Sequence, residues 1–230
     1  MVFYLSLFIL ELVLLFFLSK KLVNSLAQLF YQLNFSHKTV VHILAILFLP
    51  GTIIHELAHL LVAGVIFIPV GELNVLPQIE GEQVKLGSVQ IGKSDPFRRM
   101  IVGVAPVFVG ILSILGILYF LQIGNNFVWW YVLLSLYLVF EIGNTMFSSD
   151  KDLEGVIGFF IAILLVGLAA LGSLYFLRPV LLQNIWLNLH KIDISIFANF
   201  FKQTSFYLTI PISLDLIIIF MTKLFKKLYN

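Results

Sequence analysis

The stretch TVVHILAILFLPGTIIHELAHLLVAGVIFI, which is residues 39–68, determines the solvent in which this chain folds. It is mostly apolar and longer than the roughly 20 residues that cross a bilayer. The whole chain shares this character, because 60% of its 230 residues are hydrophobic and only 11% are charged. A soluble domain of this size cannot hide so much apolar surface, since much of any small globule faces water. We therefore predict an all-α polytopic membrane protein whose main partner is the lipid bilayer.

About six segments are apolar and long enough to be transmembrane helices. They are 2–19, 39–68, 100–122, 127–147, 156–177 and 207–222. The first lacks a basic region and a small-residue cleavage site, so we expect a retained helix rather than a signal peptide. Two further segments, 22–38 and 180–206, interleave apolar and polar residues, which favours helices lying in the membrane interface.

Two local patterns interrupt the helical periodicity. Pro50-Gly51 breaks the second span, and we expect a kink there with Thr52 as the N-cap of the helix that follows. Within 70–95, two short runs alternate polar and apolar residues, which predicts a small membrane-associated β-hairpin or sheet. The chain has no internal repeat and no long linker, so we treat 1–230 as a single membrane domain.

Charge and cysteine content exclude several classes of function. The formal net charge is only +2, and no run of lysine and arginine is present, so nucleic acid is not an expected partner. The chain has no cysteine, which excludes disulfides and thiolate metal ligands.

The second span contains the motif His55-Glu56-Leu57-Ala58-His59. On a helix, residues four apart share a face, so His55 and His59 can reach one metal ion. Glu56 then stands beside that metal, where it can take a proton from water. Polar groups in an apolar helix are costly unless they are paired or coordinated. The motif predicts one zinc ion per chain; the alternative is a set of core histidines satisfied by their neighbours, or a degenerate site.

Two histidines do not complete a catalytic zinc site, which usually has three protein ligands. No third histidine follows at a short spacing, so we expect a carboxylate from elsewhere in the chain. The best cluster lies at the end of the fourth span, where Glu141, Asn144, Asp150 and Asp152 occur within twelve residues.

This combination resembles the site-2 protease family of intramembrane zinc proteases (M50 type). That family pairs a His-Glu-x-x-His helix with a later Asn-x-x-Pro…Asp-Gly element, and Asn144 precedes Asp152 by the family's eight residues. The resemblance implies that Asp152 is the third ligand, with Asp150 and then Glu141 as alternatives. It implies a substrate-binding or supporting role for Asn144, and we predict the same role for Glu141.

The resemblance covers a catalytic core of about 39–155. Within it, Phe147 stands where the family has proline, and Leu153 stands where the family has glycine. The chain is therefore similar to a divergent member.

The function implied is an intramembrane zinc metalloprotease that hydrolyses peptide bonds of transmembrane protein substrates. Such a substrate must unwind locally, because its carbonyls are otherwise hydrogen-bonded within its own helix. We expect the extended segment to add to the edge of the hairpin, with Glu56 as general base toward the zinc-activated water.

For location, we expect a multi-pass protein of a prokaryotic cytoplasmic membrane, with its active site toward the cytoplasmic face. If both termini are cytoplasmic, six spans place eight lysine and arginine residues on that side and six on the other.

Three other functions compete with this one: a non-proteolytic M50-like pseudoprotease, a membrane transporter or metal-handling protein, and a gluzincin-type protease with Glu141 as third ligand. Glu11 and Asp215 are also ionisable at membrane depth, which indicates a functional role or pairing with a neighbouring helix.

Overall fold

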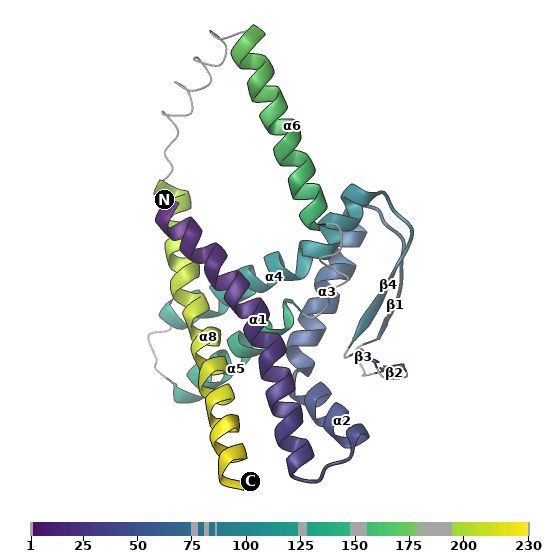
Figure 1. The fold of residues 1–230 in the computed structure, drawn as a ribbon, viewed down its shortest axis with the longest axis vertical. Helices are drawn as coiled ribbons and strands as arrows, with labels where there is room; N and C mark the ends of the chain where they lie inside the picture. Colours follow the sequence, from purple (N-terminus) through teal and green to yellow (C-terminus); the bar gives the residue numbers. More distant parts are fainter. Residues whose placement is uncertain are drawn as a thin grey trace.

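The computed structural model describes residues 2–74, 78–80, 83–85, 87–123, 128–147, 156–177, 180 and 195–229. The described chain is mainly helical, with a small antiparallel sheet (Figure 1). The helices are α1 (Val2–Gln32), α2 (His37–Leu47), α3 (Leu49–Val65), α4 (Pro96–Ile123), α5 (Trp129–Thr145), α6 (Val156–Leu177) and α8 (Ser195–Tyr229). The strands are β1 (Val70–Asn74), β2 (Gln78–Glu80), β3 (Gln83–Lys85) and β4 (Ser88–Ile91). The predicted fold class is thus confirmed at the level of a helical protein with a small sheet.

The long helices α1 and α8 lie side by side and run in the same direction (Figure 1). The Phe8 and Phe201 rings meet at 5.4 Å between centroids. Further along both helices, Leu15 and Pro211 come together beside Gly143 of α5. The two termini of the chain consequently lie at opposite ends of this helix pair.

The parallel pairing of α1 and α8 does not support the predicted topology (Figure 1). Six alternating spans would make the first and last helices antiparallel and would put both termini on one face. In the structure, α6 extends beyond the bundle at the end where α8 begins (Figure 1). The prediction of a site near the cytoplasmic face came from counting lysine and arginine residues on either side of six spans. Without six confirmed spans, that count does not support it.

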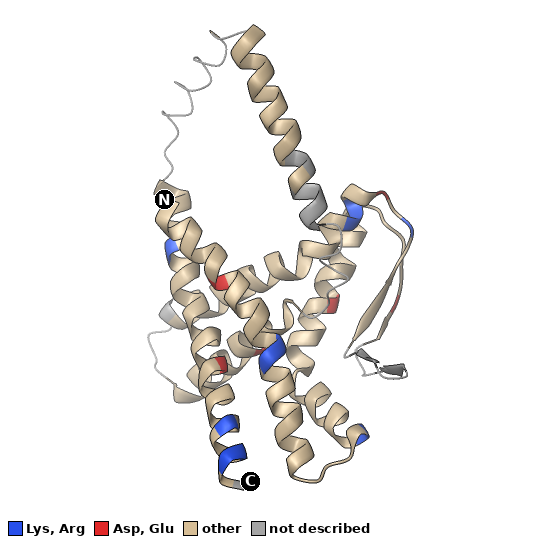
Figure 2. Cartoon of the chain, in the orientation of Figure 1, with Lys and Arg blue, Asp and Glu red and all other residues tan. Residues whose placement is uncertain are grey.

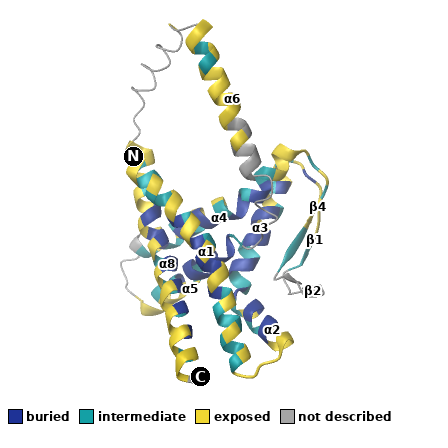
Figure 3. Cartoon of the chain, in the orientation of Figure 1, coloured by how far each residue is buried: buried dark blue, intermediate teal, exposed yellow. Residues whose placement is uncertain are grey.

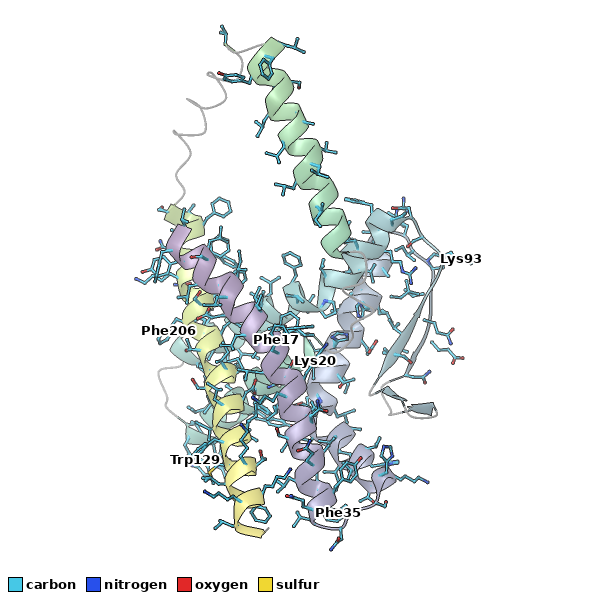
Figure 4. The ribbon with its side chains drawn as sticks, viewed as in Figure 1. Phe17, Lys20, Phe35, Lys93, Trp129 and Phe206 are labelled. Carbon is cyan, nitrogen blue, oxygen red and sulfur yellow. The ribbon has the colours of Figure 1, made fainter. Side chains whose placement is uncertain are left out.

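Three helices of the described chain are long and apolar enough to cross a bilayer, namely α1, α4 and α8. The α2–α3 pair, which is bent by 69°, raises the number to four if it is one span. Six spans are therefore not confirmed. Large apolar side chains cover the outside of these helices; Phe17 is 63% exposed and Phe206 is 69% exposed (Figures 3 and 4). A surface of this kind suits lipid rather than water.

Two segments predicted to lie in the interface belong to longer helices. Residues 22–32 continue α1, because no proline or glycine interrupts it before the turn at Asn34, whose φ of 63° ends the helix. The 31 residues of α1 extend about 46 Å, more than the hydrocarbon thickness, so its end reaches the interface. Ser195 begins α8 well before the predicted span at 207; residues 181–194 of the other segment lie outside the described residues.

The break between α2 and α3 is confirmed, but it lies before Pro50 rather than after it. Phe48 separates the two helices, and Pro50 occupies the first turn of α3, where its missing N–H has no helical partner to lose. Thr52 is therefore inside the helix and not its N-cap. Its hydroxyl donates to the Phe48 carbonyl at 2.9 Å.

Helices α3 and α5 pack against each other in parallel. The Tyr137 hydroxyl donates to the Leu47 carbonyl at 3.1 Å, and the Phe48 and Phe140 rings stack at 6.2 Å. One turn later, Gly51 lies against Thr145 at the end of α5. The predicted common direction of the second and fourth spans is thus confirmed for these helices.

Glycine allows two of the close helix crossings. A Cβ on Gly51 would lie 2.6 Å from the backbone oxygen of Glu141. A Cβ on Gly143 would lie 2.8 Å from Cβ of Pro211 on α8. Helices in lipid associate mainly by van der Waals packing, so such close backbone approach stabilises the bundle.

The strands form two short two-stranded antiparallel sheets, β1–β4 and β2–β3. In the first, Val70 pairs with Ile91 and Asn74 with Ser88; in the second, β2 pairs with β3. The β1–β4 ladder packs beside α3 (Figure 1). The predicted hairpin within 70–95 is confirmed, and it lies next to the helix that carries the histidine motif.

Candidate metal and catalytic site

The histidine motif lies in the middle of α3, on the side that faces the interior of the bundle. His55 is 3% exposed, Glu56 6% and His59 3%. Helices α1, α3 and α8 each carry an acidic residue within a long stretch that otherwise has no charged side chain (Figure 2). The motif therefore places ionisable groups where lipid and protein exclude water, which requires them to have partners of their own.

The two imidazoles approach each other through the nitrogen atoms that commonly bind metals. Their Nε2 atoms are 3.1 Å apart, and the ring centroids are 4.7 Å apart at an angle of 83°. With zinc–nitrogen bonds of about 2.05 Å, a separation of 3.1 Å corresponds to an angle of about 98° at the metal. That angle is near the tetrahedral value, so the histidine pair fits a zinc ion.

A backbone carbonyl of α4 fixes the ring of His59. Its Nδ1 donates to the Val102 carbonyl at 2.9 Å. A carbonyl only accepts, so Nδ1 carries the proton and Nε2 presents its lone pair. Metal-binding histidines are commonly held in this way by a second partner, which sets both tautomer and orientation.

The Val102 carbonyl is available because of the sequence of α4 itself. In a helix, this carbonyl would accept from the N–H of the residue four positions later, which is Pro106. Proline has no N–H, and its ring pushes against that carbonyl. The sequence did not predict this function of Val102, although a proline inside a span, four residues after the acceptor, is a visible signal.

The start of β4 lies against Glu56. A Cβ on Gly87 would lie 2.7 Å from Cγ2 of Thr52, 3.1 Å from Cγ of Glu56 and 3.2 Å from its Oε1. Only a residue without a side chain lets the hairpin come this close. The sheet edge and the proposed general base therefore border the same space.

The third ligand predicted from the sequence lies outside the described residues, since Asp150 and Asp152 are both in the undescribed 148–155 segment. Among the described residues, no group of three histidine, aspartate or glutamate side chains converges. Glu141, the remaining alternative, does not join the two histidines in such a group. Its fully buried carboxyl group faces the backbone amide of Gly51 without reaching hydrogen-bond geometry.

Asn144 lies in the last turn of α5 and is 6% exposed. Its Nδ2 donates to the Phe140 carbonyl at 3.0 Å and to Oδ1 of Asp215 at 2.8 Å. Asp215, on α8, is fully buried. Of the two ionisable residues that the sequence marked at membrane depth, Asp215 thus contacts a predicted site residue, and Glu11 is buried on α1 beside α8.

A comparison of the chain with protein-family models, curated proteins and solved structures finds no match. The similarity to site-2 proteases rests on the motif residues of this sequence.

Proposed function

We propose that this chain is an intramembrane zinc metalloprotease of the site-2 type, cleaving peptide bonds of transmembrane substrates. The observation that carries the proposal is the buried His55–His59 pair, with Nε2 atoms 3.1 Å apart and the His59 ring fixed by the Val102 carbonyl. The Val102 contact orients the His59 ring with its Nε2 lone pair toward His55, which is the arrangement that a shared metal ion requires.

His55 and His59 would hold the zinc with one carboxylate from the chain that follows α5. The parallel packing of α3 and α5 supports this source. Thr145, at the end of α5, lies beside Gly51, and His55 follows Gly51 by one helical turn of about 6 Å. The chain that leaves α5 therefore starts one turn before the histidine pair. We propose Asp152 as the ligand, with Asp150 as the alternative.

Zinc bound there would supply Lewis acidity toward a scissile carbonyl and toward water. Glu56 follows His55 directly and lies beside Gly87, so it borders both the metal site and the start of β4. It would take the proton of the attacking water and later deliver it to the amine of the leaving chain. An unwound substrate segment would pair with the free edge of the β1–β4 ladder next to it.

The first experiment measures the metal content of detergent-purified protein by mass spectrometry. We expect about one zinc per chain in the wild type, and loss of zinc in His59→Ala and in Asp152→Ala. Asp150→Ala is the matched control, because it removes a neighbouring carboxylate. If Asp150→Ala loses zinc and Asp152→Ala keeps it, the ligand assignment is reversed. Wild-type protein without zinc would refute the metal site.

The second experiment tests cleavage. The probe is a synthetic peptide with one apolar span of about 20 residues, interrupted by Asn-Gly and carrying a fluorophore and a quencher. We expect zinc-dependent cleavage by the wild type, abolished by a chelator and by Glu56→Gln, which keeps its zinc. A wild-type protein that binds zinc and peptide but leaves the peptide intact would instead be a pseudoprotease.

A further inference from the structure

A buried hydrogen bond joins α5 to α8 beside the candidate site. Asn144 Nδ2 donates to Oδ1 of Asp215 at 2.8 Å, and neither side chain is more than 6% exposed. The C-terminal helix lies outside the 39–155 region that resembles site-2 proteases. Asp215 therefore belongs to a part of the chain for which the resemblance implies nothing.

The contacts of Asn144 fix which way its amide points. Nδ2 donates to the Phe140 carbonyl at 3.0 Å as well as to Asp215. A carbonyl and a carboxylate are both acceptors, so the nitrogen must face them and the oxygen must face away. Both N–H groups are then used. The remaining atom, Oδ1, is buried and has no hydrogen-bond partner in the described part of the chain.

Packing alone does not account for Asp215. Pro211, one turn earlier on α8, already fits against Gly143, so the α5–α8 contact is set by apolar atoms. A carboxyl group in this place has a desolvation cost that a leucine of similar size would avoid. Its Oδ2 also has no partner among the described residues. What the carboxylate adds is a fixed acceptor for the Asn144 amide.

We propose that Asp215 is a positioning residue, which holds the Asn144 amide so that Oδ1 accepts a backbone N–H of an extended substrate segment. This inference rests on the proposed function. A transmembrane helix that unwinds for cleavage frees backbone N–H groups, and in a site without water each of them needs an acceptor. Asn144 lies next to Thr145, which contacts α3 at Gly51, about one helical turn before His55.

The test measures peptide binding and not only cleavage. The interrupted-span peptide described above is titrated against the Glu56→Gln protein in detergent, and its Kd is followed by fluorescence anisotropy. Asp215→Leu removes the acceptor, and we expect Kd to rise about fivefold, the worth of one oriented hydrogen bond. Asp215→Asn keeps an acceptor oxygen at the same position, so it should restore binding. Zinc content should stay the same in both variants.

Two controls separate positioning from folding. Thr204→Val alters another buried polar residue of α8, whose hydroxyl donates to the Phe200 carbonyl of its own helix, and should leave Kd unchanged. Asn144→Leu should raise Kd by a similar factor, and adding Asp215→Leu to it should have no further effect. Equal and additive effects of the two substitutions would overturn the inference, because Asp215 would then act independently of Asn144.

The outcomes distinguish this inference from the proposed function. Cleavage by the wild type together with unchanged Kd in Asp215→Leu would overturn the inference and leave the protease proposal standing. Binding that depends on Asp215, with no cleavage by the wild type, would support the inference and overturn the proposed hydrolysis. A Glu56→Gln protein that does not bind the peptide, together with a wild type that does not cleave it, would overturn both.

Discussion

Replacing Pro106 by alanine gives α4 the backbone N–H that it lacks at this position. In a regular helix this N–H would donate to the Val102 carbonyl, four residues earlier. That carbonyl now accepts from Nδ1 of His59 at 2.9 Å. The proline ring, which pushes the carbonyl away from the helix axis, is also removed. After the substitution, the backbone N–H at position 106 and Nδ1 of His59 compete for the same Val102 carbonyl.

The zinc affinity and the stability of the metal-free protein should change in opposite directions. Loss of a second partner of a metal-bound histidine typically lowers metal affinity by about 10- to 100-fold, or about 1.4–2.7 kcal/mol. The metal-free protein should become more stable, because a proline inside a helix costs about 3 kcal/mol relative to alanine. A general disruption of the fold would lower both quantities together.

The assay is a competition titration of zinc against a chelator, with the thermal unfolding of the metal-free protein measured in the same detergent. Pro211→Ala is the matched control, since it makes the same change inside α8, where the proline packs on Gly143 and not on the histidine pair. Its zinc affinity should equal that of the wild type. If Pro106→Ala binds zinc as tightly as the wild type, the Val102 contact does not support the metal site and our reasoning about α4 is refuted.

Two further predictions concern close approaches by glycine. Gly87→Ala should lower cleavage about 10- to 100-fold while zinc is retained. A methyl group 2.7 Å from Thr52 Cγ2 must displace the hairpin by about 0.7 Å to reach ordinary contact, which moves it relative to Glu56. Thr52→Ser removes that Cγ2, so the double variant should recover activity in the peptide assay; a double variant as slow as Gly87→Ala would contradict this geometry. Gly51→Ala should destabilise the protein by about 1–3 kcal/mol, since its methyl group would meet the Glu141 backbone oxygen at 2.6 Å. Gly64→Ala, with nothing within 4 Å, should be neutral or slightly stabilising in the same thermal assay, and equal losses in the two variants would argue against the α3–α5 crossing.

Hydropathy and periodicity predict much of this fold because they report the local environment of each segment. The apolar runs, the break at Pro50-Gly51 and the hairpin within 70–95 are all visible in the sequence and are present in the structure. The direction of α8 relative to α1 is a different kind of property. It depends on where α6 leaves the bundle, and neither composition nor hydropathy along the chain encodes that. The six-span prediction is not confirmed for the described residues.

The candidate site shows the same division between local and long-range information. Spacing alone predicts that His55 and His59 share a face, and their 3.1 Å separation confirms it. The acceptor for His59 comes from α4, 43 residues away, and the partner of Asn144 comes from α8, 71 residues away. Asp215 was marked from the sequence as ionisable at membrane depth, whereas the role of Pro106 was not predicted. Their partners follow only from the packing of the helices.

Pro50, Pro106 and Pro211 lie in three different helices, each close in sequence to a residue of the candidate site or to a residue that contacts it. Pro50 lets α3 begin beside the end of α5, one turn before His55. Pro106 frees the Val102 carbonyl for His59, and Pro211 fits against Gly143 one turn before Asp215. In a bilayer, water does not supply missing hydrogen-bond partners, so a freed backbone group or a buried carboxylate must be matched by another part of the protein. Pro106 lies four residues after Val102, whose carbonyl holds His59, and Pro211 lies four residues before Asp215, which holds Asn144. Pro50 lies five residues before His55. In the hydrolase proposed above, these prolines would help the helices to fix an imidazole and an amide where water cannot do so.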